Sequence, residues 1–150
     1  MNEIQLKNLE LKTFTEQDVL DYCQINNLNS DKITILNLFN NNLTDISGIR
    51  LFKNLEILYL GYNEIKDISV LRDLNKLKEL YLGTNNIKDI SVIEYLKKLK
   101  YLSIIDLELE SDQFKYINFC KNLEKLYCRN GFKDMNVLNQ FNKNIINIFV

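Results

Sequence analysis

Apolar residues recur along this chain with a period of 22, most regularly in three consecutive units that begin at Ile33, Leu55 and Leu77. In each unit the first apolar residue is followed three and five places later by two more, with one polar or aromatic residue between those two. Such alternation predicts a short strand with one buried face. One strand cannot bury that face alone, so we expect the units to stack side by side around a continuous core.

Two polar features repeat with the same period. An asparagine follows each predicted strand, at Asn41, Asn63 and Asn85, and the triplet Asp-Ile-Ser comes four residues later. A side-chain amide both donates and accepts, so this column is predicted to form a ladder that satisfies backbone groups of adjacent turns. Each Asp is predicted to cap a short helical turn on the convex side. A calcium or magnesium site is disfavoured, because these Asp residues lie strands apart and a metal needs converging oxygens.

Two further units depart from the pattern. The fourth, residues 99–122, is 24 residues long and has Leu107 where asparagine is expected. Because Leu107 and Leu109 alternate with glutamates, this segment is predicted either to extend the strand or to bulge outward. The fifth, residues 123–144, has a turn one residue shorter, so Asp134 and Met135 stand in for Asp-Ile. A sixth unit begins at Ile145 and consists of a strand only.

This pattern resembles the leucine-rich repeat family, in the 22-residue class shared by bacterial internalins and the small leucine-rich regulator of type 1 protein phosphatase. The resemblance covers residues 32–150, which we expect to form five repeats plus a terminal strand. It implies an α/β fold, a right-handed solenoid with a parallel β-sheet on its concave face. Because the family binds many unrelated partners, the resemblance is specific for fold rather than for function.

Residues 1–31 lack the repeat and are expected to form an N-terminal helical cap, as internalin-type proteins have. Thr15 followed by acidic residues predicts a helix start, and Asn26-Asn27 predicts its end. The apolar face of this helix is predicted to consist of Val19, Leu20, Tyr22 and Cys23. Before the helix, the apolar residues Ile4, Leu6, Leu9 and Leu11 predict a strand, or a hairpin that turns at Lys7-Asn8. The whole segment would cover the open edge of the first coil.

The balance of acidic and basic residues argues against those classes of function that need a basic surface. The net charge is −1, from 19 basic and 20 acidic residues among 150, so a dedicated nucleic-acid binder or a protein drawn to anionic membranes is not expected. No stretch reaches the roughly 18 apolar residues of a membrane span, and the start does not resemble a signal peptide. The three cysteines, an odd number, favour reduced thiols and a cytoplasmic location.

Enzymatic chemistry is not expected. Histidine is absent, so His-based acid–base catalysis and His metal sites are excluded. Cys120 and Cys128 fall at core-facing places of their units, and Cys23 falls on the apolar face of the predicted helix. The four glycines are scattered, so no phosphate-binding loop is formed. We therefore expect no catalytic residue, no cofactor and no metal.

The surface most suited to function is the outer face of the predicted sheet. In each unit the second, third, fifth, seventh and eighth residues are expected to point outward, and these places hold five of the eight tyrosines. The candidate partner-binding residues are Phe39, Ile57, Tyr59, Tyr62, Glu79, Tyr81, Tyr101, Lys125, Tyr127, Arg129 and Phe149. Gly61 and Gly83 would leave hollows between the tyrosines. The alternative is that the aromatic rings stack across strands only to stabilise the sheet.

The leading hypothesis is a protein–protein interaction module that binds an unidentified partner through this concave face. The family resemblance implies phosphatases or host receptors as partner classes, but no contact residue carries over. A second hypothesis is a self-assembling repeat protein. It rests on the strand Ile145–Val150, which has no polar capping segment after it and could pair with another copy as a homo-oligomer.

Overall fold

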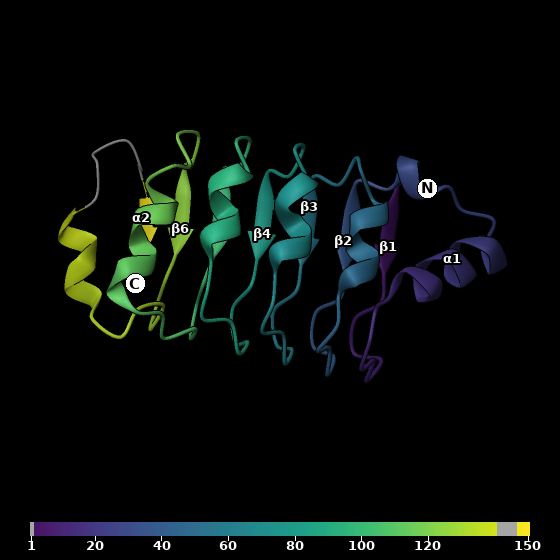
Figure 1. Ribbon diagram of the computed structural model, residues 1–150, viewed down its shortest axis with the longest axis horizontal. Helices are drawn as coiled ribbons and strands as arrows, with labels where there is room; N and C mark the ends of the chain where they lie inside the picture. Colours follow the sequence, from purple (N-terminus) through teal and green to yellow (C-terminus); the bar gives the residue numbers. More distant parts are fainter. Residues whose placement is uncertain (1, 141–146) are drawn as a thin grey trace.

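The computed structural model describes residues 2–140 and 147–150, which form a parallel β-sheet backed by short helices (Figure 1). In these residues seven strands pair in sequence order, each parallel to the next. The strands are β1 (Glu3–Gln5), β2 (Ile35–Asn37), β3 (Ile57–Tyr59), β4 (Glu79–Tyr81), β5 (Tyr101–Ser103), β6 (Lys125–Tyr127) and β7 (Asn147–Phe149). This order is that of a solenoid, as predicted, and Ile145 lies outside the described residues.

One helical segment or more connects each strand to the next, on the side of the coil away from the sheet (Figure 1). The α-helices are α1 (Glu16–Ile25) and α2 (Phe114–Ile117). The 3₁₀ helices are η1 (Ser30–Lys32), η2 (Ser47–Leu51), η3 (Ser69–Asp73), η4 (Ser91–Tyr95), η5 (Ser111–Gln113) and η6 (Met135–Gln140). In Figure 1 the strands succeed one another along the long axis, with α1 at the N-terminal end.

The middle residue of each strand from β2 to β6 is fully buried, and its two neighbours in the strand face the opposite side. Leu58 of β3 pairs in register with Leu80 of β4, and both side chains are 0% exposed. The first apolar residue of each unit is buried as well, as at Leu55 and Leu77. The predicted alternation is therefore confirmed, and the core is one continuous, mainly aliphatic cluster that runs the length of the solenoid.

The asparagine ladder is also present. Asn63 Oδ1 accepts a hydrogen bond from the backbone N–H of Leu43 at 3.1 Å. Its Nδ2 donates to the carbonyl oxygens of Leu38 at 3.0 Å and Leu60 at 2.9 Å, so one side chain bonds backbone of its own coil and of the preceding one. Asn41 and Asn85 make the equivalent bonds. These bonds satisfy backbone groups at the sharp turns after β2, β3 and β4.

The Asp residues of the Asp-Ile-Ser triplets open the 3₁₀ helices, as expected. Asp45 Oδ1 accepts from the N–H of Ser47 at 2.8 Å, and the same bond recurs at Asp67, Asp89 and Asp134. Each of these carboxylates thus satisfies a donor at the start of a helical turn.

The N-terminal segment covers the first repeat from two sides. Strand β1 pairs in parallel with β2, so the strand predicted near Ile4 forms and the hairpin does not. Helix α1 begins after Thr15 and ends at Asn26, as predicted, with a capping box between Thr15 and Asp18. Leu20 is 54% exposed, so its predicted place on the buried face is wrong. The division into a cap, 1–31, and repeats, 32–150, remains a proposal, since β1 shares the sheet of the repeats.

Gly48 allows α1 to pack closely on the first repeat. A Cβ atom at this residue would overlap the carbonyl oxygen of Thr15 and lie 2.7 Å from Val19 Cγ2. The following units have Val70 and Val92 at the same place. The first repeat therefore differs from its neighbours at the residue that α1 approaches most closely.

The fourth unit absorbs its two extra residues in its helices rather than in its strand. Strand β5 ends at Ser103, and Glu108 has a positive φ of 51°, so the predicted strand extension is wrong. Leu107 and Leu109 are 1% and 0% exposed, so this segment does not bulge away from the core either. Helix α2 follows η5 directly and packs against η4. The asparagine ladder gives way here to an apolar contact at Leu107.

We predict that Asn63→Ala lowers the free energy of unfolding by about 1–3 kcal/mol, because buried backbone donors and acceptors lose their partner. Chemical denaturation measures this change. The matched control is Asn86→Ala, which alters an exposed asparagine of the next unit and should stay within about 0.5 kcal/mol of wild type. Equal stabilities of the two variants would contradict the ladder.

We predict that Gly48→Val, which introduces the residue found in the next two units, lowers the free energy of unfolding by about 1–3 kcal/mol. The valine side chain would overlap Thr15 and Val19, so α1 would have to move away from η2. Hydrogen exchange should show lost protection in α1 while the amides of β4 keep theirs. Ser69→Val in η3 adds a similar side chain one coil further on and serves as the control. Unchanged protection of α1 in Gly48→Val would refute the packing role of this glycine.

Candidate protein-binding face

The sheet places the predicted partner-binding residues on one surface. We call this surface the tyrosine-rich concave face and define it by the first and third residues of the strands and the residues that follow them. The first residues of neighbouring strands form one row, which contains Ile57, Glu79, Tyr101 and Lys125. The third residues form a second row, which contains Tyr59, Tyr81, Ser103, Tyr127 and Phe149. Phe39, Tyr62 and Arg129 lie just beyond the strand ends.

The second row contains two aromatic stacks. The rings of Tyr59 and Tyr81 lie 4.7 Å apart between centroids, with an interplanar angle of 12°. The rings of Tyr127 and Phe149 lie 4.6 Å apart at 11°. Ser103 lies between the two stacks, in register with Tyr81 on one side and Tyr127 on the other. Parallel in-register strands thus bring identical places of successive units to stacking distance.

Glu79 holds the hydroxyl of the central tyrosine. Tyr81 Oη donates to Glu79 Oε2 at 2.8 Å, along the same strand. Burial, above all, raises the pKa of Tyr81, and the hydrogen bond to Glu79 and the charge of that carboxylate act in the same direction. The pKa of Tyr59 is raised too, again mainly by burial. Both tyrosines therefore stay neutral, and the hydroxyl of Tyr81 remains a donor to Glu79.

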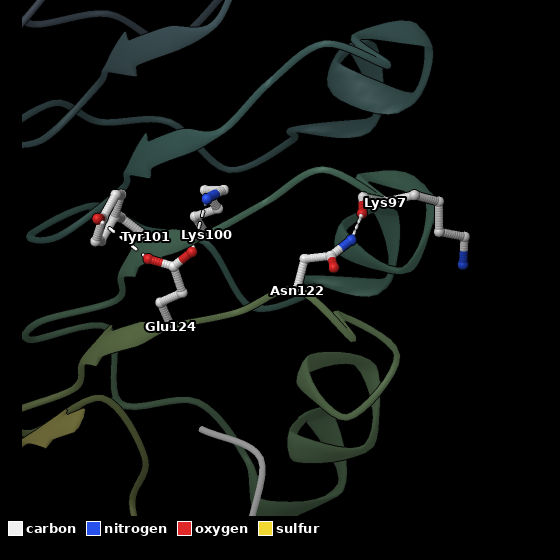
Figure 2. Close-up of polar contacts among 5 residues, drawn as sticks. All are labelled: Lys97, Lys100, Tyr101, Asn122 and Glu124. Carbon is white, nitrogen blue, oxygen red and sulfur yellow. Dashed lines mark hydrogen bonds and ion pairs between the residues drawn. The ribbon is translucent and has the colours of Figure 1, made fainter. Parts of the chain in front are cut away.

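The charged residues of this face pair across neighbouring strands. Figure 2 shows Glu124 between Lys100 and Tyr101: Lys100 Nζ donates at 2.7 Å and Tyr101 Oη at 3.3 Å. The hydrogen bond from Lys100 lowers the pKa of Glu124. The nitrogen of Lys125 lies 5.1 Å from the centroid of the Tyr101 ring. Behind the sheet, Asn122 Nδ2 donates to the carbonyl oxygen of Lys97 at 2.7 Å and ties the same two coils together (Figure 2).

A hollow of about 250 Å³ opens on this face. Its lining is Phe39, Tyr59, Gly61, Tyr62, Tyr81, Gly83, Thr84, Ser103, Ile105 and Arg129. The hollow expected at Gly61 and Gly83 is therefore present, although Gly61 itself is buried. A Cβ on Gly83 would lie 3.0 Å from the carbonyl oxygen of Ile105. The depth of the hollow therefore depends on the absence of a side chain at Gly83.

A column of left-handed residues turns the chain at the edge of this hollow, and the sequence analysis missed it. Tyr62 and Thr84 have φ values of 57° and 55°. Asn8, Asn40 and Asn130 hold the same conformation at the equivalent place of their coils, and asparagine tolerates it best among residues with side chains. The recurring asparagine was the available signal. At Tyr62 the conformation directs an exposed ring against Phe39, with centroids 5.2 Å apart.

A second hollow, of about 540 Å³, lies on the opposite side of the coil, between η2 and η3. It is lined by alternating charges, among them Asp45, Arg50, Asp67 and Arg72. Across residues 2–140 and 147–150, no group of three or more His, Cys, Asp or Glu is arranged to hold a metal ion. The same residues contain no helix that is long and apolar enough to cross a membrane.

The cysteine thiols are unsuited to nucleophilic chemistry. Burial raises the pKa of Cys120 to about 12 and that of Cys128 to about 11. Cys23 is half-buried, and desolvation raises its pKa as well. The thiolate is the reactive form, so at neutral pH all three cysteines are held as weakly reactive thiols.

Comparison with protein families agrees with this geometry. The family model described as leucine-rich repeats, in two copies, matches residues 31–73 and 53–95. Comparison with curated proteins gives no match. An internalin (inlF) from Listeria monocytogenes is 30% identical to this chain, with a TM-score of 0.69, over 78% of this chain and 34% of the internalin. Internalin C2 (inlC2) from the same organism is 30% identical, with a TM-score of 0.70, over 79% and 52%.

A leucine-rich repeat protein of Leptospira interrogans matches 99% of this chain and 37% of its own length, with a TM-score of 0.75 and 22% identity, and so supports the fold. Residues 31–95 match the leucine-rich repeat family, and the chain has the fold of a leucine-rich repeat solenoid. It spans between about a third and about half of the length of these solved relatives.

We predict that a soluble disulfide reagent such as Ellman's modifies one of the three thiols, Cys23, in the folded protein at neutral pH. Raising the pH to about 9 should accelerate this reaction alone, because Cys120 and Cys128 keep their protons there. Unfolding in guanidinium should make all three thiols accessible to the reagent at once. Rapid modification of Cys120 or Cys128 in the native protein would contradict their burial.

Proposed function

We propose that this chain is a protein-interaction module that binds a partner protein through the tyrosine-rich concave face. The observation that carries the proposal is the hollow at Gly61 and Gly83 with its aromatic walls. Concave surfaces are what leucine-rich repeat solenoids offer to partners. Tyrosines around a recess, with an arginine at one end, have the composition of interface hot spots.

Sheet stabilisation alone does not account for these rings. Stacking explains Tyr59 on Tyr81, which lie on adjacent strands in register. It does not explain Tyr62, which lies outside the strands, adopts a left-handed backbone conformation and is 53% exposed. Phe39 beside it is 37% exposed. This aromatic pair is exposed to solvent, and Tyr62 adopts a backbone conformation that is unfavourable for a large side chain. Contact with a partner explains both features better than stabilisation of the sheet does.

The absence of histidine and the weakly reactive thiols support a binding rather than a catalytic role. The cytoplasmic location expected from the odd number of cysteines remains a prediction. The even charge balance favours a protein partner over nucleic acid.

Self-assembly through β7 is the second proposal. Ile148 occupies the core-facing place of β7 and is 36% exposed, whereas the equivalent residue of β6, Leu126, is 0% exposed. Burial of this side chain requires either a further coil or a second copy. Sedimentation equilibrium of this 150-residue chain distinguishes a monomer from a homo-oligomer, and a concentration-independent monomer would refute the proposal.

We predict that replacing Tyr59, Tyr81 and Tyr127 together by Ala abolishes partner binding while the fold survives, because these rings lie outside the aliphatic core. Each ring is expected to contribute about 2 kcal/mol of affinity if it is a hot spot. Affinity capture from an extract of the source organism, followed by calorimetry with the captured partner, measures the loss.

The matched control replaces two exposed aromatic residues of the convex side, Tyr95 and Phe119, by Ala. This variant should capture the same partner with wild-type affinity. Melting curves of all three proteins show that they are folded. Unchanged affinity of the triple tyrosine variant would refute binding through the tyrosine-rich concave face.

A further inference from the structure

One stacking position in the aromatic row is vacant. Neighbouring strands lie about 4.8 Å apart, so the rings of Tyr81 and Tyr127, two strands apart, are separated by roughly 9.6 Å. A planar ring placed midway would lie at the spacing that the two existing stacks show, 4.7 and 4.6 Å. Ser103, the residue at this place, is too short to fill it. We call the space above Ser103, between Tyr81 and Tyr127, the slot.

Tyr81 and Tyr127 lie in register on either side of Ser103 and form the two walls of the slot; Tyr81 also lines the hollow, and Tyr127 does not. Ser103 is only 7% exposed, which places its side chain at the bottom between the rings. The hollow at Gly61 and Gly83 reaches it, since Tyr81, Ser103 and Ile105 all line that hollow. A side chain that enters the hollow can therefore slide one aromatic face against each wall.

The charged residues beside the slot indicate which kind of side chain would lie next to an inserted aromatic ring. Glu79 already accepts the hydroxyl of Tyr81, and Glu124 is bound by Lys100 and Tyr101. Among the ion pairs of the described residues none involves Lys125, whose nitrogen faces the Tyr101 ring. Lys125 lies two residues before Tyr127 and disfavours a guanidinium group as the planar occupant, whereas Arg129, two residues after Tyr127, is paired with Asp106 at 3.4 Å. A carboxylate next to the ring would pair with Lys125.

We propose that the slot receives one aromatic side chain of the partner protein, from a segment that carries an acidic residue beside it. The inserted ring would complete a continuous stack of five rings, from Tyr59 to Phe149, and would be desolvated on both faces. This inference rests on the proposed function and names the chemistry that the tyrosine-rich concave face recognises. A nucleobase is the competing planar group, but from β3 to β7 this row has a single gap between aromatic rings, and strand-binding surfaces stack several successive bases along a basic groove.

The absence of tryptophan from this chain provides a direct test. The probe is the peptide acetyl-Glu-Trp-Glu-amide, whose indole is excited selectively at about 295 nm against the tyrosines of the protein. We expect a saturable change of its fluorescence with a Kd of about 1 mM, as befits a single side chain. Acetyl-Lys-Trp-Lys-amide should bind about tenfold more weakly, and Lys125→Gln should remove most of this difference.

Ser103→Tyr fills the slot with a ring of the protein itself and should abolish the signal without lowering the melting temperature. Gln5→Tyr adds a tyrosine to the same row on β1, away from the slot, and should bind the probe as wild type does. Tyr127→Leu removes one wall and should weaken binding about tenfold, which keeps the test decisive if Ser103→Tyr folds poorly. Equal binding by wild type and Tyr127→Leu, or no saturable change with wild type, would overturn the proposal.

Two further results separate this inference from the proposed function. If Ser103→Tyr still captures the partner while the triple tyrosine variant does not, the slot is wrong and binding through the tyrosine-rich concave face stands. If the triple variant captures the partner, the proposed function itself fails. Displacement of the peptide by adenosine monophosphate at lower concentrations than the peptide needs would assign the slot to a nucleobase and overturn the protein partner.

Discussion

Every coil of this solenoid depends on how its backbone is satisfied after a strand of only three residues. The chain turns there at a left-handed residue, and the amides beyond the turn have left the sheet. The amide of Asn63 bonds the coil before it as well as its own, so the turn and the stacking of coils are stabilised by the same bonds. A buried amide with all its hydrogen bonds made allows little freedom in register.

That register has a chemical consequence on the other side of the strands. Since each strand is aligned residue for residue with the next, one substitution in a repeat changes one place in a row and leaves the row itself intact. Tyr59 stacks on Tyr81 for this reason, and Ser103 interrupts the row without moving Tyr127. The chemical character of the face is thus set row by row, while the apolar residues between the rows keep the scaffold unchanged.

The sequence predicted well whatever depends on local period. Burial of Leu58, the bonds of Asn63 and the outward direction of Tyr81 all follow from a place within the repeat, which the spacing of 22 defines. The features it missed depend on contacts between distant segments or on backbone conformation. The exposure of Leu20 depends on how α1 lies across η2, and no periodic signal encodes that angle. The depth of the hollow depends on the positions of the aromatic rings around Gly61, and these positions cannot be derived from the spacing of residues in the sequence.

Because α1 packs against Gly48, the repeats differ in whether they can be duplicated or deleted. An internal coil with valine at this place, such as those containing Val70 and Val92, meets the same neighbours on both sides and can be copied or removed with its surroundings preserved. The coil that contains Gly48 can be followed by such a unit but cannot be preceded by one, because a valine there would displace the helix. Insertion of whole repeats is therefore blocked before the coil of Gly48, and the length of the tyrosine-rich concave face can vary over generations while its N-terminal end stays fixed.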